Sequence, residues 1–141
     1  MFSMQLKGID MGQKVHEQFI AQLQKAEQSG DVSQLASMFA DDATLTKPAA
    51  KDASGSVDAT RFWQGYLDGF SEIRSTFSNV VDAGKTAVLE WSSEGKLSNG
   101  DPISYRGVSI LEIAGDKIQA FRTYYDSAVF VLAERNAVAA H

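Results

Sequence analysis

The hydrophobic positions at the start of the chain follow a helical period. Apolar residues recur every three or four positions, with polar residues on the other faces: Val15, Phe19, Leu23 and Ala26. This pattern is typical of a helix with one buried side, and it predicts a helix over 12–29. Gly30 marks its end, because glycine readily adopts the left-handed cap conformation.

Two further helices are predicted. Asp31 is placed to cap a short helix whose inner side carries apolar residues: Leu35, Met38 and Phe39. Alternation over 43–47 predicts a short strand, which Pro48 ends. Asp58 is placed to cap a third helix over 59–70, which is rich in aromatic residues: Phe62, Trp63, Tyr66 and Phe70.

The second half of the chain reads as a strand meander. Strands are predicted over 72–82, 85–95, 103–113 and 117–127, with glycine-containing hairpin turns between them, and a helical segment over 128–137. Helices followed by strands indicate an α+β fold with helices on one face of a mostly antiparallel sheet. The other face needs cover if it is apolar, so we expect a homodimer formed through the sheet.

Composition limits the classes of function. The 141 residues suit one domain, and the apolar content of 44% allows a substantial core. A net charge of −5 argues against nucleic-acid partners and anionic membranes. With no cysteine, no signal-peptide pattern and no membrane-length apolar run, we expect a cytoplasmic protein. No cluster has the spacing of a metal site, and no cofactor is expected.

Three segments carry a resemblance to a known family. "FADDATLTKP" is similar to the helix-to-strand junction of the nuclear-transport-factor-2-like superfamily, and "GFSEIRSTFSNVVDAGKTAVLEWSSEG" and "GVSILEIAGDKIQAFRTYYD" resemble its hairpins. The chain most resembles the SnoaL-like (polyketide cyclase type) branch. The resemblance implies a cone-shaped fold with a pocket, over residues 12–130, between a flexible arm (1–11) and a C-terminal tail (131–141).

The resemblance does not bring the catalytic groups of its best-known enzymes. The aspartate base of ketosteroid isomerases falls on Lys47, and their acid donor falls near Val108. The charged positions of limonene epoxide hydrolases fall on Ser92, Glu90 and Thr123, and the polyketide cyclase aspartate also falls near Thr123. Neither valine nor threonine can act as an acid or base near neutral pH.

Strand alternation, oriented by the resemblance, predicts which residues line the pocket. We expect Glu90 and these further residues to face inward: Lys47, Trp63, Tyr66, Ser92, Tyr105, Phe121, Thr123 and Tyr125. Glu90 is the candidate acid or base, and an ion pair between Lys47 and Glu90 would grip a polar end of a ligand. In the alternative to this ion pair, the Lys47 side chain reaches the mouth of the cone and the Glu90 side chain lies in solvent.

Two functional hypotheses follow. The first is a SnoaL-like protein that binds a small hydrophobic organic molecule, with cofactor-free lyase, isomerase or hydrolase chemistry if it is an enzyme. The second is a non-catalytic dimerisation or protein-interaction module whose cone is filled by side chains. His16 is predicted on the surface, and Asp41 and Asp42 as solvated turn residues.

Overall fold

The computed structural model describes residues 14–48 and 58–130. The elements follow one another in this order: α2 (Val15–Ser29), α3 (Ser33–Ala36), β2 (Phe39–Thr46), α4 (Ala59–Asp68), β3 (Phe70–Asp82), β4 (Thr86–Leu97), β5 (Pro102–Ala114) and β6 (Lys117–Tyr125). The predicted order of helices and strands is confirmed. The arm (1–11), the tail (131–141) and most of the predicted helix over 128–137 lie outside the described residues.

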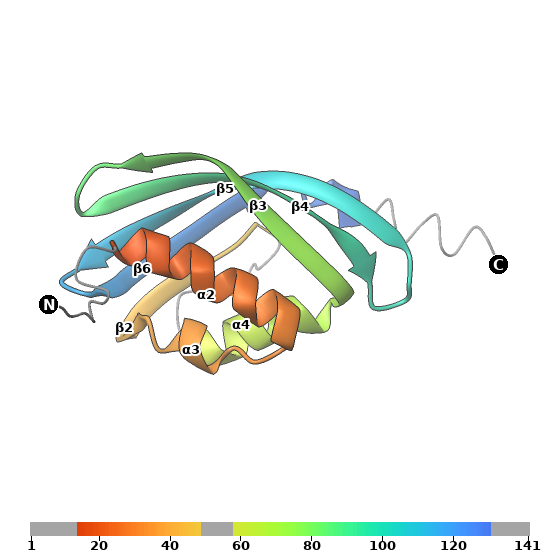
Figure 1. Ribbon diagram of the computed structural model, residues 1–141, viewed down its shortest axis with the longest axis horizontal. Helices are drawn as coiled ribbons and strands as arrows, with labels where there is room; N and C mark the ends of the chain where they lie inside the picture. The colour runs from red at the N-terminus through yellow and green to blue at the C-terminus, as the bar shows by residue number, and fades with distance from the viewer. Residues whose placement is uncertain (1–13, 49–57, 131–141) are drawn as a thin grey trace, which may run out of the picture.

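The strands form a single curved sheet in the order β2-β6-β5-β4-β3. The hairpins from β3 to β6 are antiparallel, whereas β2 pairs with β6 in parallel. The sheet arches over the helices, as Figure 1 shows. The α+β fold with a curved, mostly antiparallel sheet is therefore confirmed.

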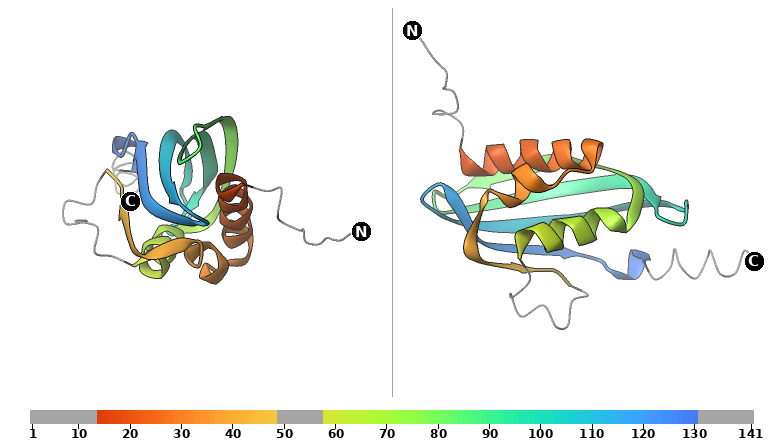
Figure 2. Two further views of the ribbon diagram at one scale, coloured as in Figure 1. Left: turned by 90° about the vertical axis from the view of Figure 1, so that its left-hand side faces the viewer. Right: turned by 90° about the horizontal axis from the view of Figure 1, so that it is seen from below.

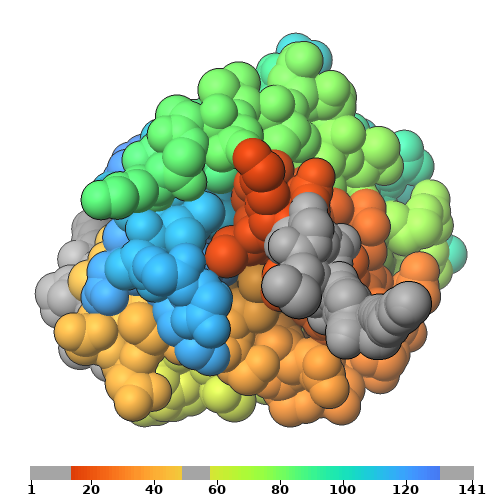
Figure 3. Space-filling model, turned by 60° about the vertical axis from the view of Figure 1, so that its left-hand side comes forward, coloured from red at the N-terminus to blue at the C-terminus, as the bar shows by residue number. Residues whose placement is uncertain are grey.

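The helices lie on the concave side of the sheet. In Figure 2 the sheet wraps around the interior, with α3 and α4 beside β2 and with α2 along the edge that β3 forms. Figure 3 shows α2 (red) between the β3–β4 hairpin (green) and the hairpin that joins β5 to β6 (blue). The space between helices and sheet holds the core.

Aromatic rings fill much of this core. Trp63 of α4 packs against Phe19 of α2 and Phe121 of β6, with ring centroids 5.8 and 5.2 Å apart. Each of these three side chains is almost fully buried. Large aromatic side chains contribute strongly to core stability, so this contact fixes α2 and α4 on the sheet.

Most of the predicted helix ends and turns are present, but the N-cap of α3 is Val32 rather than Asp31, whose carboxylate accepts from the Ser33 N–H. Gly30 caps α2 with φ of 81°, and its N–H donates to the Ala26 carbonyl. The Asp58 carboxylate accepts from the Arg61 N–H at the start of α4. Positive φ at the hairpin glycines also fits the sequence, because only glycine adopts that conformation without strain: Gly84, Gly100 and Gly115.

Side chains of helix α2 form hydrogen bonds with the backbone N–H and carbonyl groups of Ser75 on the edge strand β3. The Ser75 N–H donates to the Glu27 carboxylate (2.9 Å), and the Ser75 carbonyl accepts from the Gln24 amide (3.1 Å). Unpaired backbone groups on an edge strand invite association with other chains. At Ser75, two side chains one helical turn apart thus provide the hydrogen bonds that a neighbouring strand would otherwise provide.

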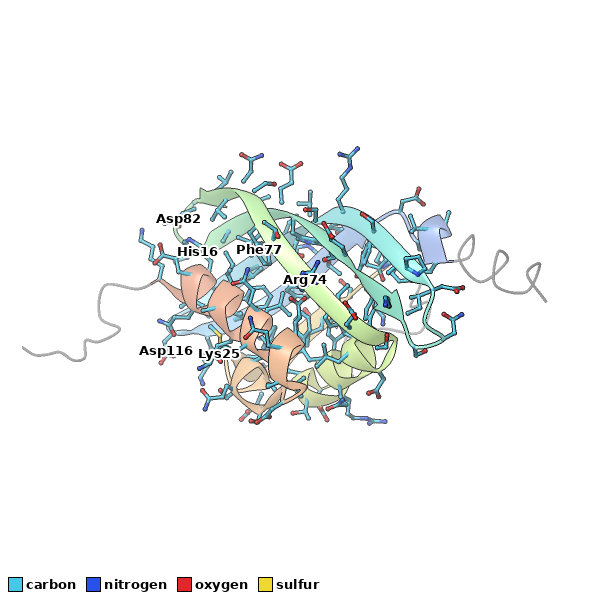
Figure 4. All side chains as sticks on the ribbon, turned by 45° about the vertical axis from the view of Figure 1, so that its right-hand side comes forward. His16, Lys25, Arg74, Phe77, Asp82 and Asp116 are labelled. Carbon is cyan, nitrogen blue, oxygen red and sulfur yellow. The ribbon has the colours of Figure 1, made fainter. Side chains whose placement is uncertain are left out.

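Several local predictions are wrong. His16 is buried, with 4% of its surface exposed, because the first turn of α2, to which it belongs, packs beside the end of β3 near Asp82 (Figure 4). Asp41 and Asp42 are exposed, but they lie within β2 rather than in a turn, since that strand begins at Phe39. Phe70 begins β3 rather than ending α4, and Phe39 begins β2 rather than lying on the short helix before it.

Candidate functional site

An inner cavity of about 70 Å³ lies between the concave face of the sheet and the helices. Its wall is mostly aromatic, with a few hydroxyl groups. The lining includes Trp63 and Tyr66 from α4, Trp91 and Ser93 from β4, Tyr105 and Ser109 from β5, and Phe121, Thr123 and Tyr125 from β6. The cavity thus gathers residues from distant parts of the chain.

A wider outer hollow of about 460 Å³ adjoins the inner cavity. It is lined by the C-terminal half of α4, the β4–β5 turn and the segment after β6, including Gly65, Ser98 and Phe130. Four residues line both spaces: Lys47, Tyr66, Tyr105 and Tyr125. These four residues form the boundary between the two spaces.

The predicted orientation of β4 is wrong. Trp91 pairs with Gly107 and faces the cavity, so its neighbours Glu90 and Ser92 face outward. Both of these side chains are exposed, and the Glu90 carboxylate accepts from the Asn79 amide at 2.6 Å on the outer face. A shift of one residue in a strand exchanges its two faces, which removes Glu90 as the acid or base of the cavity.

Lys47 lies at the boundary but does not pair with Glu90. Its side chain is exposed, and its Nζ lies 5.6 Å from the centroid of the Phe62 ring. This distance is within the range of a cation–π contact. The hypothesis of a buried ion pair is therefore wrong, whereas the alternative, with Lys47 at the mouth of the cone and Glu90 exposed, agrees with the structure. Lys47 supplies a positive charge at the entrance of the inner cavity.

The carboxylate that reaches the cavity wall is Glu27 of α2, which our sequence reasoning missed. Its Oε2 accepts from the Tyr66 hydroxyl (2.8 Å) and the Ser75 hydroxyl (2.6 Å), and its Oε1 accepts from the Ser75 N–H. The Ser75 hydroxyl also contacts that of Ser93 at 2.7 Å. A chain of hydrogen bonds thus joins a half-buried carboxylate to three residues that line the cavity.

Burial dominates the electrostatics of this cluster. Burial raises the pKa of Glu27, an effect that the hydrogen bonds from Ser75 and Tyr66 partly offset. Burial also raises the pKa of Tyr66, Tyr105 and Tyr125. The tyrosines therefore keep their protons, whereas Glu27 is the group in the cluster that can change its charge nearest to neutral pH.

A second polar cluster lies on the sheet side of the cavity. The Trp91 indole N–H donates to the Ser109 hydroxyl at 2.9 Å, and this hydroxyl contacts that of Thr123 at 2.9 Å. Only one of the two hydroxyl hydrogens is needed for the contact between Ser109 and Thr123. The other can donate to a molecule in the cavity.

Trp63 carries an unsatisfied donor. Its indole lines the cavity and is 4% exposed, yet its Nε1 is buried with no hydrogen-bond partner among the described residues. A buried N–H without an acceptor costs free energy, of the order of 1–3 kcal/mol. Because this nitrogen has almost no accessible surface, even toward the cavity, its N–H lies within the wall rather than at its surface.

Comparison with known proteins identifies the family. A family model described as "SnoaL-like domain" matches residues 17–121, which is most of the chain. The chain belongs to the SnoaL-like domain family. No curated protein sequence matches it.

Several solved structures share the fold of this SnoaL-like chain. An NTF2-like protein from Anabaena variabilis is 24% identical, with a TM-score of 0.70 over 80% of this chain and 87% of that one. AclR from Streptomyces galilaeus is 12% identical, with a TM-score of 0.66 over 82% and 92%. AusH from Aspergillus nidulans is 21% identical, with a TM-score of 0.61 over 80% and 82%. At these identities the likeness shows the fold alone.

The SnoaL-like fold brings together most of the residues singled out from sequence. Glu90 and Ser92 do not line the inner cavity, whereas the other predicted residues do: Lys47, Trp63, Tyr66, Tyr105, Phe121, Thr123 and Tyr125. That any of them binds a ligand stays a prediction. Glu27 did carry a signal, because it continues the spacing of four that joins Val15, Phe19 and Leu23.

Among residues 14–48 and 58–130, no group of three or more histidine, aspartate or glutamate side chains is arranged to hold a metal ion. None of the helices in the same ranges has the length and apolar character that a membrane span requires.

Proposed function

We propose that this protein binds a small, mainly apolar organic molecule that carries a polar oxygen, in the inner cavity and the outer hollow. The hydroxyl hydrogen left over from the Ser109–Thr123 contact is the main support, since a donor in a mostly apolar wall suits a ligand acceptor.

The two spaces suit different parts of one ligand. At about 70 Å³ the inner cavity is smaller than typical ligand pockets of about 300–1,000 Å³, whereas the outer hollow, at about 460 Å³, falls within that range. A ligand would therefore place one small oxygen-bearing group among the polar side chains of the inner cavity. Its apolar body would lie in the outer hollow.

The rival hypothesis, a non-catalytic module with a filled cone, has less support. A filled cone would leave no space beside the buried Trp63 and Trp91, yet both indoles border the inner cavity. These are also the two tryptophans of the chain, so tryptophan fluorescence reports directly on occupancy of the cavity.

Gly65 provides a test of ligand entry. It lies on α4 at the outer hollow, and a Cβ built there meets no atom within 4 Å. We expect wild type and Gly65→Ala to bind 1-indanone more tightly than indane, which lacks the carbonyl acceptor. The larger side chain of Gly65→Phe should weaken both by at least tenfold by occupying the hollow.

Binding would be measured by calorimetry and by the change in tryptophan emission, with Gly65→Ala as the matched control. Equal affinity of wild type and Gly65→Phe, or no binding of either compound to wild type, would contradict the proposed function.

We also propose that two copies associate through the convex face of the sheet. Apolar side chains gather there on neighbouring strands and form what we term the outer patch: Val81, Val88, Val108, Ile110 and Tyr124. Val81 and Tyr124 are 56% and 53% exposed. An exposed apolar group of this kind on a sheet face suits a protein interface.

A further inference from the structure

Glu27 places its carboxyl group in an unusual setting. It is half-buried, and none of the ion pairs among the described residues involves it. The titratable side chains that act on it or on its partners are Tyr66 from α4, Tyr105 from β5 and Tyr125 from β6. Removing a carboxylate from water without a neighbouring cation is costly, so the hydrogen bonds to Glu27 are the main interactions that stabilise its charged form.

With Glu27 ionised, the hydroxyl hydrogens of the cluster have fixed directions. Tyr66 and Ser75 both donate to the carboxylate, and Ser93 must then donate to Ser75. The hydrogens of Tyr66 and Ser93 are thus committed to Glu27 and Ser75. Both residues line the cavity, so their remaining lone pairs are available to accept hydrogen bonds from a molecule there.

Another part of the wall donates, because the Ser109–Thr123 pair has a hydroxyl hydrogen to give. A ligand hydroxyl suits both parts, since it can donate to Tyr66 or Ser93 and accept from this pair. Lys47 adds a positive charge at the boundary with the outer hollow, which favours a hydroxyl that can become an anion.

We propose that Glu27 and Tyr66 form a proton relay that accepts a proton from an acidic hydroxyl, a phenol or an enol, of the bound ligand. The ligand O–H bond breaks as its proton moves to Tyr66 Oη, and the Tyr66 proton moves to Glu27 Oε2. Tyr66 is neutral before and after the transfer. The negative charge passes from Glu27 to the ligand oxygen, and no oxidant or co-reactant is needed.

The site favours this transfer in three ways. The distance of 2.8 Å between Tyr66 Oη and Glu27 Oε2 is that of a direct proton-transfer contact. The charge moves from a position without a cation toward the boundary where Lys47 lies. Burial makes a free tyrosinate unfavourable, so the two proton movements are coupled through Tyr66.

A purely structural role for Glu27 is the competing explanation. The carboxylate accepts the Ser75 N–H of the edge strand, which supports β3 whatever the cavity holds. The side chain of Gln also has an acceptor oxygen, so Glu27→Gln retains that support but cannot take up a proton. A test must therefore measure the transfer of the proton rather than the stability of the protein.

The relay rests on the proposed function, and 4-nitrophenol tests the two separately. The full chain would be titrated at a pH where the free probe is mainly un-ionised. Visible absorbance gives the ionised fraction of the bound probe, and calorimetry in two buffers of different ionisation enthalpy gives the protons released. Nitrobenzene is the matched ligand that lacks the hydroxyl.

We expect wild type to bind the probe as the phenolate without releasing a proton, because Glu27 keeps it. Glu27→Gln and Tyr66→Phe should bind the neutral probe, with loss of the phenolate band, or ionise it only by releasing a proton to the buffer. Glu90→Gln removes an equal charge from the outer face and should behave as wild type.

Binding of the neutral probe by wild type would overturn the relay, as would a phenolate band and proton count unchanged in both Glu27→Gln and Tyr66→Phe. Binding of nitrobenzene without 4-nitrophenol would overturn the relay and leave the proposed function standing. Binding of neither compound would overturn both.

Discussion

At the scale of single residues, the structure makes Glu27 the candidate acid or base in place of Glu90, which the sequence suggested. Glu90 is exposed on the convex face and is bonded to Asn79. Glu27 is half-buried and bonded to Tyr66 and Ser75. Carboxylates differ in chemistry through their surroundings, so the second of these glutamates is the candidate acid or base.

The raised pKa of Glu27 predicts how stability depends on pH. The folded protein holds this proton more tightly than the unfolded chain, whose glutamates titrate near 4.5. The contribution of Glu27 to the free energy of unfolding is therefore fully present below that pH. It is lost as pH rises through the higher pKa of the folded state.

Glu27→Gln should lack this dependence. We expect the free energy of unfolding of wild type, relative to that of Glu27→Gln, to fall as pH rises above about 4.5 and then to level off. Urea unfolding across the pH range measures it. Glu90→Gln, changed at an exposed carboxylate, is the control, and an equal pH slope in wild type and Glu27→Gln would refute the prediction.

At the scale of elements, the packing of β4 against β5 requires a glycine. A Cβ at Gly107 would lie 2.6 Å from Cζ2 of Trp91 and would also overlap the Tyr124 carbonyl oxygen. Because Gly107 has no side chain, the Trp91 indole has room to lie above β5. From there the indole donates to Ser109 on the cavity wall.

Gly107→Ala should destabilise the protein by about 1–3 kcal/mol, because overpacking displaces side chain or backbone. Gly65→Ala, on an exposed helical position with open space, should instead stabilise it by up to about 1 kcal/mol. Urea denaturation of both variants gives the two values. A Gly107→Ala variant as stable as wild type would show that the indole has room to move.

At the scale of the whole molecule, the sheet has two faces with different tasks. The concave face covers the cavity, and the convex face carries the outer patch together with charged groups such as the Arg122–Glu112 ion pair. The two proposals, ligand binding and association of two copies, therefore concern opposite faces and can be tested independently.

Ile110 lies within the outer patch and tests the proposed homodimer. It pairs with Val88 on one side and Arg122 on the other. We expect sedimentation to give a dimer for wild type and a monomer for Ile110→Lys, because a lysine cannot be buried there without a partner. Ser104→Lys adds the same charge on the same face of β5, outside the patch, and should stay dimeric. A monomeric wild type would exclude the interface.

The sequence by itself determined the fold, because the relevant signals are local. The spacing of Phe19, Leu23 and Ala26 gives α2 its buried face, and Gly84 and Gly115 permit the turns that order the meander. Alternation within β4 was also informative. Leu89 and Trp91 are apolar and Glu90 is charged, yet a register taken from the family resemblance placed Glu90 inside.

The chemistry of the site depends on contacts that form only in the folded protein. The spacing of four places Glu27 on the buried side of α2, but its contacts with Tyr66 and Ser75 depend on how α2 and α4 pack on β3, which no local pattern encodes. The same holds for the Trp63 N–H, whose lack of a partner appears only when every neighbour is in place. Local spacing fixes which face of an element is buried, whereas the contacts between elements fix what each buried group can do.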